Sequence, residues 1–105
     1  MIRYQVRYSH DAVNDLMNIF EYITHVELEA SNATNVIIEL KNAVQSLNTF
    51  PYRHKLFKKL RSSNKEIRMF VVKGYAIFYE IDKETKTVNI DAIISCKRDL
   101  DKIIN

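Results

Sequence analysis

The side chains in this sequence whose types could do chemistry are mostly basic, and they are concentrated in the middle of the chain. The segment 52–75 contains eight lysine and arginine residues and a single acidic one, Glu66. The rest of the chain is slightly acidic, so the formal net charge is only +3. Such a concentration of positive charge predicts a surface that attracts phosphate groups or an acidic protein segment, unless it is a solvated loop rich in lysine.

Arg68 is the basic residue whose position is most informative. It lies inside an expected strand, on the face that it shares with Phe70 and Val72. A charge on an apolar strand face needs a partner. Either a bound phosphate or a structural ion pair with a carboxylate such as Asp91 would supply one.

Lys97 and Arg98 form a second basic position. They directly follow the last expected strand, which ends at Ser95. Residues at the end of a sheet can project from a loop into a cleft, so this pair is a candidate for phosphate contact; a solvated turn is the other interpretation.

Metal, nucleophile and nucleotide chemistry are disfavoured. His10, His25 and His54 belong to three separate expected elements, and a single cysteine, Cys96, cannot build a zinc site. No motif ties a histidine to Cys96, so we expect a small buried side chain rather than a reactive thiol. With Gly74 as the only glycine, a phosphate-binding glycine loop is excluded. We therefore expect no metal and no cofactor.

The first half of the chain predicts a strand and two helices. Residues 2–8 alternate apolar and polar, as in a half-buried strand, and Ser9 is a good N-cap for a helix over residues 10–26. A second apolar stripe predicts another helix, capped by Ser31 or Asn32 and stopped near Phe50 by the proline that follows. Two such helices joined by a short polar turn form an antiparallel hairpin.

The second half predicts a basic loop followed by a meander. Residues 51–65 show no sustained period, so they are expected to form a loop, with room for a helical turn. Three strands follow at residues 66–72, 75–82 and 87–95, joined by tight polar links. Residues 98–104 could form one or two helical turns. The expected fold is α+β, in the order β-α-α-β-β-β with a short C-terminal helix: a twisted antiparallel sheet with the helical hairpin on one face.

The bulk properties agree with one cytoplasmic domain. A length of 105 residues is enough for one hydrophobic core, so residues 1–105 are expected to form a single domain. The first ten residues lack the apolar run of a signal peptide, and no stretch is long and apolar enough to span a membrane. The lone cysteine is consistent with a reducing compartment.

Several stretches together resemble the RelE/ParE superfamily of type II toxin–antitoxin toxins. The C-terminal half is similar in its arginine-bearing strand, its Gly-Tyr-x-Ile-x-Tyr strand at residues 74–79, its aliphatic strand at 88–94 and its Lys-Arg-Asp-Leu ending at 97–100. The N-terminal half is similar at residues 4–9 and in the first helix, and Phe50-Pro51 closes the second helix as in the family. The resemblance covers nearly the whole chain.

Membership would imply one of two activities. RelE-like members cut mRNA on the ribosome without a metal, using basic residues and a proton-transfer residue, whereas ParE-like members inhibit DNA gyrase. The resemblance implies phosphate or target binding by Arg68, Lys97 and Arg98, with the loop residues Lys58, Lys59 and Arg61 as further contacts.

Two departures from the family pattern favour the ParE-like activity. The arginine that often follows the strand tyrosine is Ala76 here, and residues 101–105 offer no tyrosine or histidine. The Arg-Asp ending at Arg98 is also closer to the ParE-type pattern. A RelE-like ribonuclease and a non-toxic relative that only binds an antitoxin remain as alternatives. All of these interpretations share a cognate antitoxin as partner, whose acidic or amphipathic segment would suit the basic middle of the chain.

Overall fold

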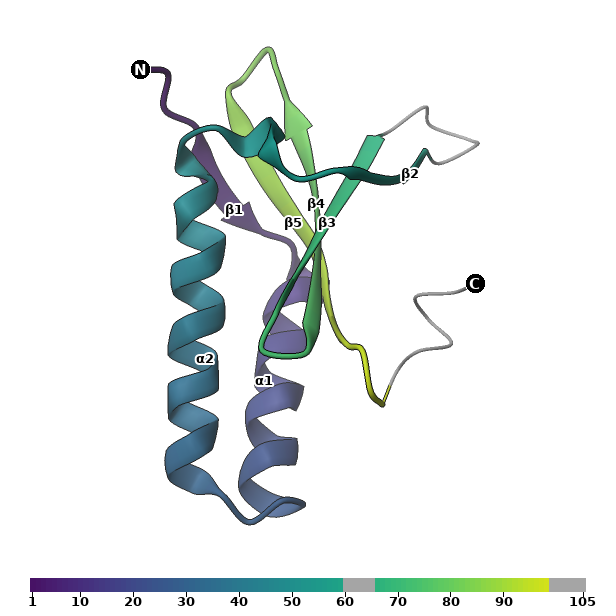
Figure 1. Ribbon diagram of the computed structural model, residues 1–105. Coiled ribbons are helices and arrows are strands. Elements are labelled where there is room, and N and C mark those ends of the chain that lie inside the picture. Colours follow the sequence, from purple (N-terminus) through teal and green to yellow (C-terminus); the bar gives the residue numbers. More distant parts are fainter. Residues whose placement is uncertain (60–65, 99–105) are drawn as a thin grey trace.

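Two helices cover one face of a five-stranded sheet in a computed structural model that describes residues 1–59 and 66–98 (Figure 1). No helix in this part of the chain is long and apolar enough to cross a membrane. In chain order the elements are β1 (Gln5–Tyr8), α1 (His10–His25), α2 (Ala30–Gln45), two 3-10 turns (Ser46–Asn48 and Pro51–Arg53), β2 (Leu56–Lys59), β3 (Glu66–Val72), β4 (Tyr75–Asp82) and β5 (Thr87–Ser95).

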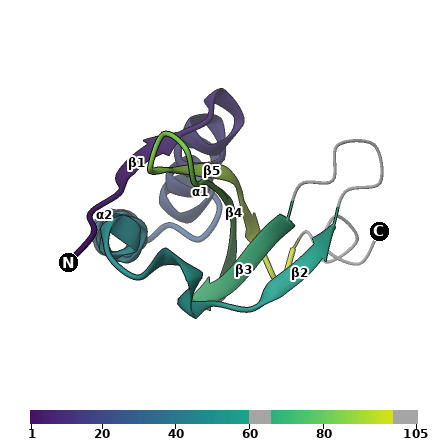
Figure 2. The ribbon, with the colours of Figure 1, turned by 90° about the horizontal axis from the view of Figure 1, so that it is seen from above.

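The strands lie in the order β1-β5-β4-β3-β2, and Figure 2 shows how the sheet twists from β1 to β2. The meander of β3, β4 and β5 is antiparallel and begins and ends at the predicted residues. Its first turn is tight, because Lys73 and Gly74 adopt φ angles of 54° and 80°, as a type I′ turn requires. The predicted α+β fold is therefore confirmed.

The N-terminal strand differs in one respect from the predicted antiparallel sheet. β1 is shorter than residues 2–8, and it pairs with β5 in parallel, with Val6 opposite Val88 and Tyr8 opposite Ile90. A hairpin turn dictates antiparallel pairing, but no turn joins these two strands. The helical hairpin and the meander lie between them in sequence, so the direction of β1 is set by tertiary packing.

The N-terminus of α1 forms as predicted. The Ser9 hydroxyl oxygen accepts a hydrogen bond from the Ala12 amide at 3.0 Å and donates one to the Asp91 carbonyl at 3.2 Å. A carboxylate oxygen of Asp15 accepts from the Ile93 amide at 2.9 Å. These contacts fix α1 to β5 at the irregularity in its pairing with β4, near Asp91.

The predicted cap of the second helix is wrong. α2 begins at Ala30, after Glu29, and neither Ser31 nor Asn32 caps it. Leu28 adopts a left-handed φ of 57°, and the Glu29 amide donates to the Ile23 carbonyl at 3.0 Å. Because this turn after α1 is tight, α2 begins before the first residue of its apolar stripe.

The basic segment 51–65 contains a strand that the sequence did not predict. Pro51–Arg53 forms the helical turn that was allowed for, and β2 then pairs with β3. Four residues, Leu-Phe-Lys-Lys, are too few to show alternation, and the register shifts between Leu56 and Lys58. The predicted C-terminal helix falls on residues 98–104, which lie outside the described residues beyond Arg98.

Apolar side chains form two clusters, one on each face of the sheet. The larger lies between the helices and the sheet and includes Leu40, Leu47, Ile77, Tyr79 and Ile90, each with no exposed surface. The smaller lies on the opposite face. The helices therefore account for the burial of one sheet face only.

We predict that Ser9→Ala lowers the free energy of unfolding by about 1 kcal/mol, because the amide of Ala12 loses its acceptor. The matched control is Ser31→Ala, in the exposed first turn of α2, which should change it by less than about 0.5 kcal/mol. Urea unfolding followed by circular dichroism measures both. Equal losses in the two variants would contradict the assignment of the caps.

Candidate functional site

Arg68 stabilises the turn around Pro51–Arg53, which lies on the helix side of the sheet. Its side chain lies on the face predicted from alternation, half-buried beside Phe70. One guanidinium nitrogen donates to the carbonyl oxygens of His54 at 2.6 Å and Tyr52 at 3.3 Å. The guanidinium carbon also lies 5.1 Å from the centroid of the Tyr52 ring. Arg68 thus has a structural task that its sequence neighbours could not reveal.

Tyr79 and His54 complete this anchor. The Tyr79 hydroxyl donates to the Pro51 carbonyl at 2.7 Å, and burial raises the pKa of Tyr79 to about 12. The His54 ring stacks on Phe70 with centroids 4.1 Å apart. Burial, and then the charge of Arg53, lower the pKa of His54. Its Nε2 atom is buried and has no hydrogen-bond partner among the residues that the structure describes.

Lys97 and Arg98 line a polar hollow of about 280 Å³ at the other end of the sheet. The Arg98 guanidinium carbon lies 3.7 Å from the centroid of the Tyr22 ring, and the Arg98 amide donates to the Ser95 hydroxyl at 3.1 Å. Lys73 also faces this hollow, with its ammonium 3.2 Å from a carboxylate oxygen of Glu39. The hollow therefore combines these cations with Glu27, and the Arg98 guanidinium lies over an aromatic ring.

The two arginines predicted to share a site are not brought together. Arg68 pairs with Tyr79, whereas Ser95 pairs with Tyr75, four residues away along β4. This offset of four residues places Arg68 and Ser95 about 13 Å apart along the sheet. Arg98 lies further on, beyond the end of the strand. Of the loop candidates, Lys58 and Lys59 lie in the edge strand β2, and Arg61 falls outside the described residues.

The face of the sheet turned away from the helices carries the smaller apolar cluster. Ile67, Ala76 and Phe78 are buried there. Partly buried hydrophobic side chains pack against them: Met69, Ala92, Ile94 and Cys96. Cys96 therefore packs against this cluster, but it is only partly buried rather than fully buried as expected. Strand alternation could have indicated this apolar face, because every second residue of β3 and β4 belongs to it.

An apolar groove lies between the two helices. Its volume is about 580 Å³. On α1, Val13, Met17 and Phe20 line it and are 43%, 61% and 37% exposed. The remaining lining residues are Tyr8, Leu16, Glu21, Ile37 and Lys41. The apolar stripe of α1 is therefore wider than its contact with the sheet requires. The width of this stripe is a signal that the sequence already contains.

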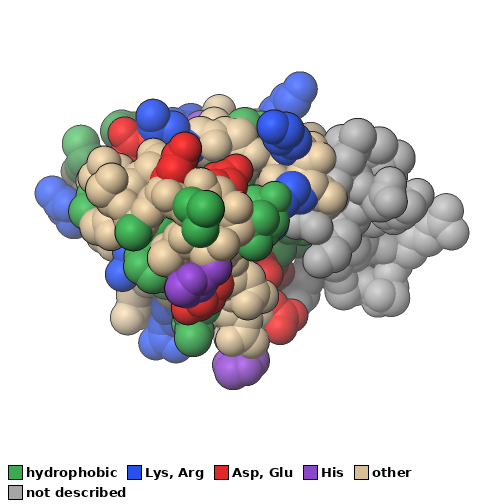
Figure 3. All heavy atoms as spheres, turned by 90° about the horizontal axis from the view of Figure 1, so that it is seen from below, with side chains coloured by type: hydrophobic (Ala, Val, Ile, Leu, Met, Phe, Trp, Pro, Cys, Tyr) green, Lys and Arg blue, Asp and Glu red, His purple; other side chains and the backbone are tan. Residues whose placement is uncertain are grey.

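The end of the hairpin also exposes apolar residues. Val26 is 62% exposed and Leu28 is 80% exposed. Viewed from this end, hydrophobic side chains lie among acidic ones (Figure 3). Across the described part of the chain, no three histidine, cysteine or acidic side chains are grouped so that they could hold a metal ion.

We predict that the protein becomes less stable as the pH falls below about 6.5, the ordinary pKa of histidine. The pKa of His54 is lower in the folded protein than in the unfolded chain, so the unfolded chain binds a proton at a higher pH. That protonation stabilises the unfolded state relative to the folded state. His54→Phe should flatten this dependence, whereas His10→Gln, at an exposed site, should retain it. Chemical unfolding between pH 7.5 and about 5 measures the effect. An unchanged slope in His54→Phe would contradict it.

Comparison with solved structures shows the same fold in toxins of two kinds. A chromosomal ParDE toxin–antitoxin system of P. aeruginosa matches with a TM-score of 0.73 and 12% identity, over 90% of this chain and 98% of that one. A RelBE toxin–antitoxin complex of Mycobacterium tuberculosis gives 0.62 and 21%, over 90% and 99%. A mutant of the E. coli toxin RelE in the free state gives 0.58 and 14%, over 97% and 90%.

The sequence itself points to one family. A search of curated proteins found no match. The family model described as the ParE toxin of the type II toxin–antitoxin system parDE matches residues 6–100. Among the described residues, that span includes both helices and, apart from Gln5 at the start of β1, all the strands. The chain therefore belongs to the ParE toxin family of type II toxin–antitoxin systems.

Proposed function

We propose that this toxin acts by binding and inhibiting DNA gyrase rather than by cutting mRNA. The observation that carries the proposal is the apolar face of the sheet opposite the helices. Ala76, where an arginine is common in the superfamily, is only 1% exposed and belongs to the same cluster as Ile67 and Phe78. With an apolar cluster in place of a cation, this face lacks the charge that phosphate chemistry needs.

Hydrolysis of a phosphodiester makes different demands. Negative charge develops on the phosphate oxygens, and preorganised cations or hydrogen-bond donors must stabilise it beside a proton-transfer group. Arg68 already donates to two backbone carbonyls, and Arg98 lies at the far end of the sheet. These two arginines therefore do not form one phosphate cradle. That separation supports a binding function.

In this proposal the basic residues contact the target instead of catalysing a reaction. Lys97 and Arg98 are the leading contacts, because they line the hollow at the sheet end. Lys58 and Lys59, in the edge strand β2, and Arg61 stay in the proposal as further contacts. Arg68 serves mainly to fix the neighbouring turn.

The test is inhibition of gyrase by the purified toxin. We predict that it blocks supercoiling of relaxed plasmid DNA, and that Arg98→Ala raises the half-inhibitory concentration by roughly tenfold, the loss of one charged contact. Lys83→Ala removes the same charge from an exposed loop and should leave inhibition unchanged. Full supercoiling in the presence of toxin, together with cleavage of ribosome-bound mRNA, would instead establish the ribonuclease.

We further propose that a cognate antitoxin neutralises the toxin by laying an amphipathic helix in the groove between α1 and α2. The P. aeruginosa and M. tuberculosis structures described above are toxin–antitoxin systems. The groove offers Val13, Met17 and Phe20 at the spacing of one helix face, with Glu21 and Lys41 also lining it. An apolar groove with charged groups beside it is the usual binding site for an amphipathic helix.

Met17→Glu should weaken antitoxin binding by roughly tenfold or more, because it places a charge in the apolar groove. Met17 is 61% exposed, so the substitution leaves the core intact. Val71→Glu is the matched control, since Val71 is 55% exposed on the opposite side of the molecule. Isothermal titration calorimetry with the antitoxin measures both. A loss confined to Val71→Glu would move the antitoxin to the sheet face.

A further inference from the structure

The helical hairpin and the segments on either side of it carry opposite charges. Residues 8–40, which include α1 and most of α2, contain six carboxylates and neither lysine nor arginine. Residues 1–7 and 46–59 contain six lysine and arginine residues and no carboxylate. Figure 1 shows the turn between the helices at one end of the molecule and the N-terminus near the opposite end. The two ends of the molecule therefore differ in the sign of their charge.

The turn between the helices exposes apolar side chains on a strained backbone. We call this region the hairpin tip and define it by Val26, Leu28, Glu21, Glu27 and Glu29. Val26 and Leu28 are two of the most exposed large apolar residues that the structure describes. Leu28 also adopts a left-handed φ of 57°, which is unfavourable for a bulky side chain. The tip thus holds an apolar side chain in solvent at a cost in free energy.

Carboxylates surround these apolar side chains. A carboxylate oxygen of Glu21 lies 3.1 Å from Nε2 of His25, and a carboxylate oxygen of Glu29 accepts from the Asn32 side-chain amide at 3.2 Å. Both contacts are at the surface. Glu27 faces the polar hollow and its cations. Glu21 and Glu29 therefore supply the negative charge of the tip.

The opposite end of α2 has the same design with the opposite charge. We call it the basic end and define it by Phe50, Ile2, Arg3 and Arg53. Phe50 is 67% exposed and adopts a left-handed φ of 48°, and Ile2 is exposed beside it in the N-terminal segment. Strained backbone persists only where the surrounding structure holds it, and it is often found at functional sites.

Hydrogen bonds fix the basic end. The Arg53 guanidinium donates to the Phe50 carbonyl at 3.1 Å, so one cation is held directly against the strained residue. The Tyr4 amide donates to the Asn48 carbonyl at 2.7 Å, which brings Arg3 beside the same turn. Phe50 is therefore displayed in one position between two arginines.

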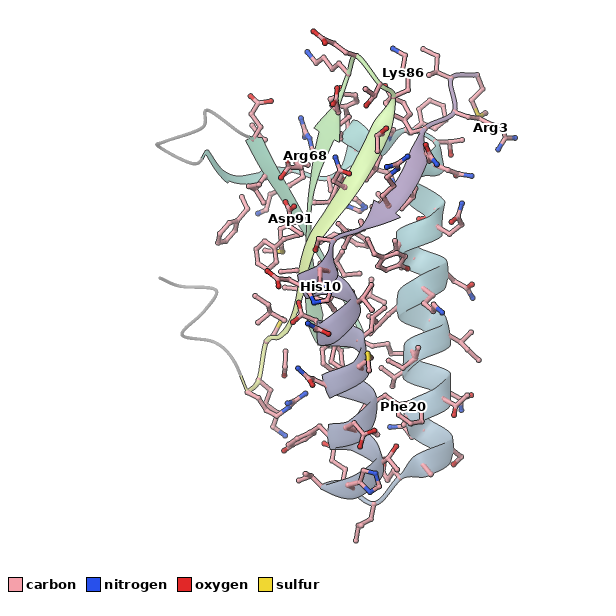
Figure 4. All side chains as sticks on the ribbon, turned by 180° about the vertical axis from the view of Figure 1, so that it is seen from behind. Arg3, His10, Phe20, Arg68, Lys86 and Asp91 are labelled. Atoms are coloured by element: carbon pink, nitrogen blue, oxygen red, sulfur yellow. The ribbon has the colours of Figure 1, made fainter. Side chains whose placement is uncertain are left out.

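The neighbouring loop does not change the sign of this end. Residues 82–86 carry two carboxylates and two lysines. Arg3 and Lys86 lie at the same end of the molecule, whereas Phe20 on α1 lies toward the hairpin tip (Figure 4). The arginines beside Phe50 thus leave an excess of positive charge.

We propose that the toxin associates with itself head to tail, with the hairpin tip of one copy docked on the basic end of the next. Each end offers an exposed apolar side chain in a fixed backbone, and the charges around the two are complementary, so a second copy of this chain matches both. Such a contact joins two different surfaces and leaves a free tip and a free basic end for further copies. It does not rest on the proposed inhibition of gyrase.

Sedimentation velocity of the purified full-length toxin tests the proposal. Both ends are small compared with the surfaces of stable complexes, so we expect the average mass to rise with protein concentration in the micromolar range. Added salt should lower that mass, because exposed charges are screened. A parent toxin that stays monomeric at all concentrations would overturn the proposal.

Two single substitutions test the two ends. Leu28→Lys places a cation opposite the basic end, and Phe50→Glu places a carboxylate opposite the tip, so each should weaken association roughly tenfold or more. Lysine fits a left-handed backbone in this chain, as Lys73 shows. Ile38→Lys is the matched control, since Ile38 is 50% exposed on α2 away from both ends, and it should associate like the parent.

Mixing the two variants distinguishes this contact from a symmetric one. Leu28→Lys retains its basic end and Phe50→Glu retains its tip, so an equimolar mixture should form dimers and nothing larger. If either end instead paired with itself, one of the two variants would associate like the parent. That result, or a mixture that stays monomeric, would contradict the head-to-tail contact. Neither result bears on gyrase, whose inhibition is measured separately.

Discussion

The buried hydroxyl of Tyr79 is the constraint on which the contact between the sheet and the chain after α2 depends. Tyr79 has no exposed surface, so its hydroxyl must find a partner inside the protein, and the Pro51 carbonyl supplies it at 2.7 Å. Arg68 adds two carbonyl contacts to the same turn. Together they hold the chain after α2 against the sheet. Tyr52 is thereby displayed at the surface, while His54 stacks on Phe70.

This anchoring distinguishes the environments of the two arginines. Arg68 is occupied by the turn, whereas Arg98 lies over Tyr22 beside an open hollow. The sheet face opposite the helices is packed with apolar side chains around Phe78. Cations at the margins of an apolar surface favour recognition of another macromolecule, because affinity comes from buried apolar area and orientation from charge.

Much of the fold could be predicted from the sequence, since local patterns determine it. The bounds of the three meander strands, the cap at Ser9 and the side of β3 on which Arg68 emerges all follow from periodicity and capping chemistry. The strand β2 and the parallel pairing of β1 could not be predicted, because both depend on distant partners. The site was harder still. The resemblance to the superfamily suggested that Arg68 and Arg98 serve one phosphate site, but pairing register places them apart.

The proposed inhibition of gyrase is tested most directly by inducing the toxin without antitoxin. The measurement is the order in which DNA synthesis and protein synthesis then fail. Pulse labelling with thymidine and with an amino acid in the first minutes would measure it. A gyrase-directed toxin of the ParE family should stop thymidine incorporation first, while amino-acid incorporation continues. An immediate collapse of protein synthesis with DNA synthesis still running would contradict that claim and identify mRNA as the target.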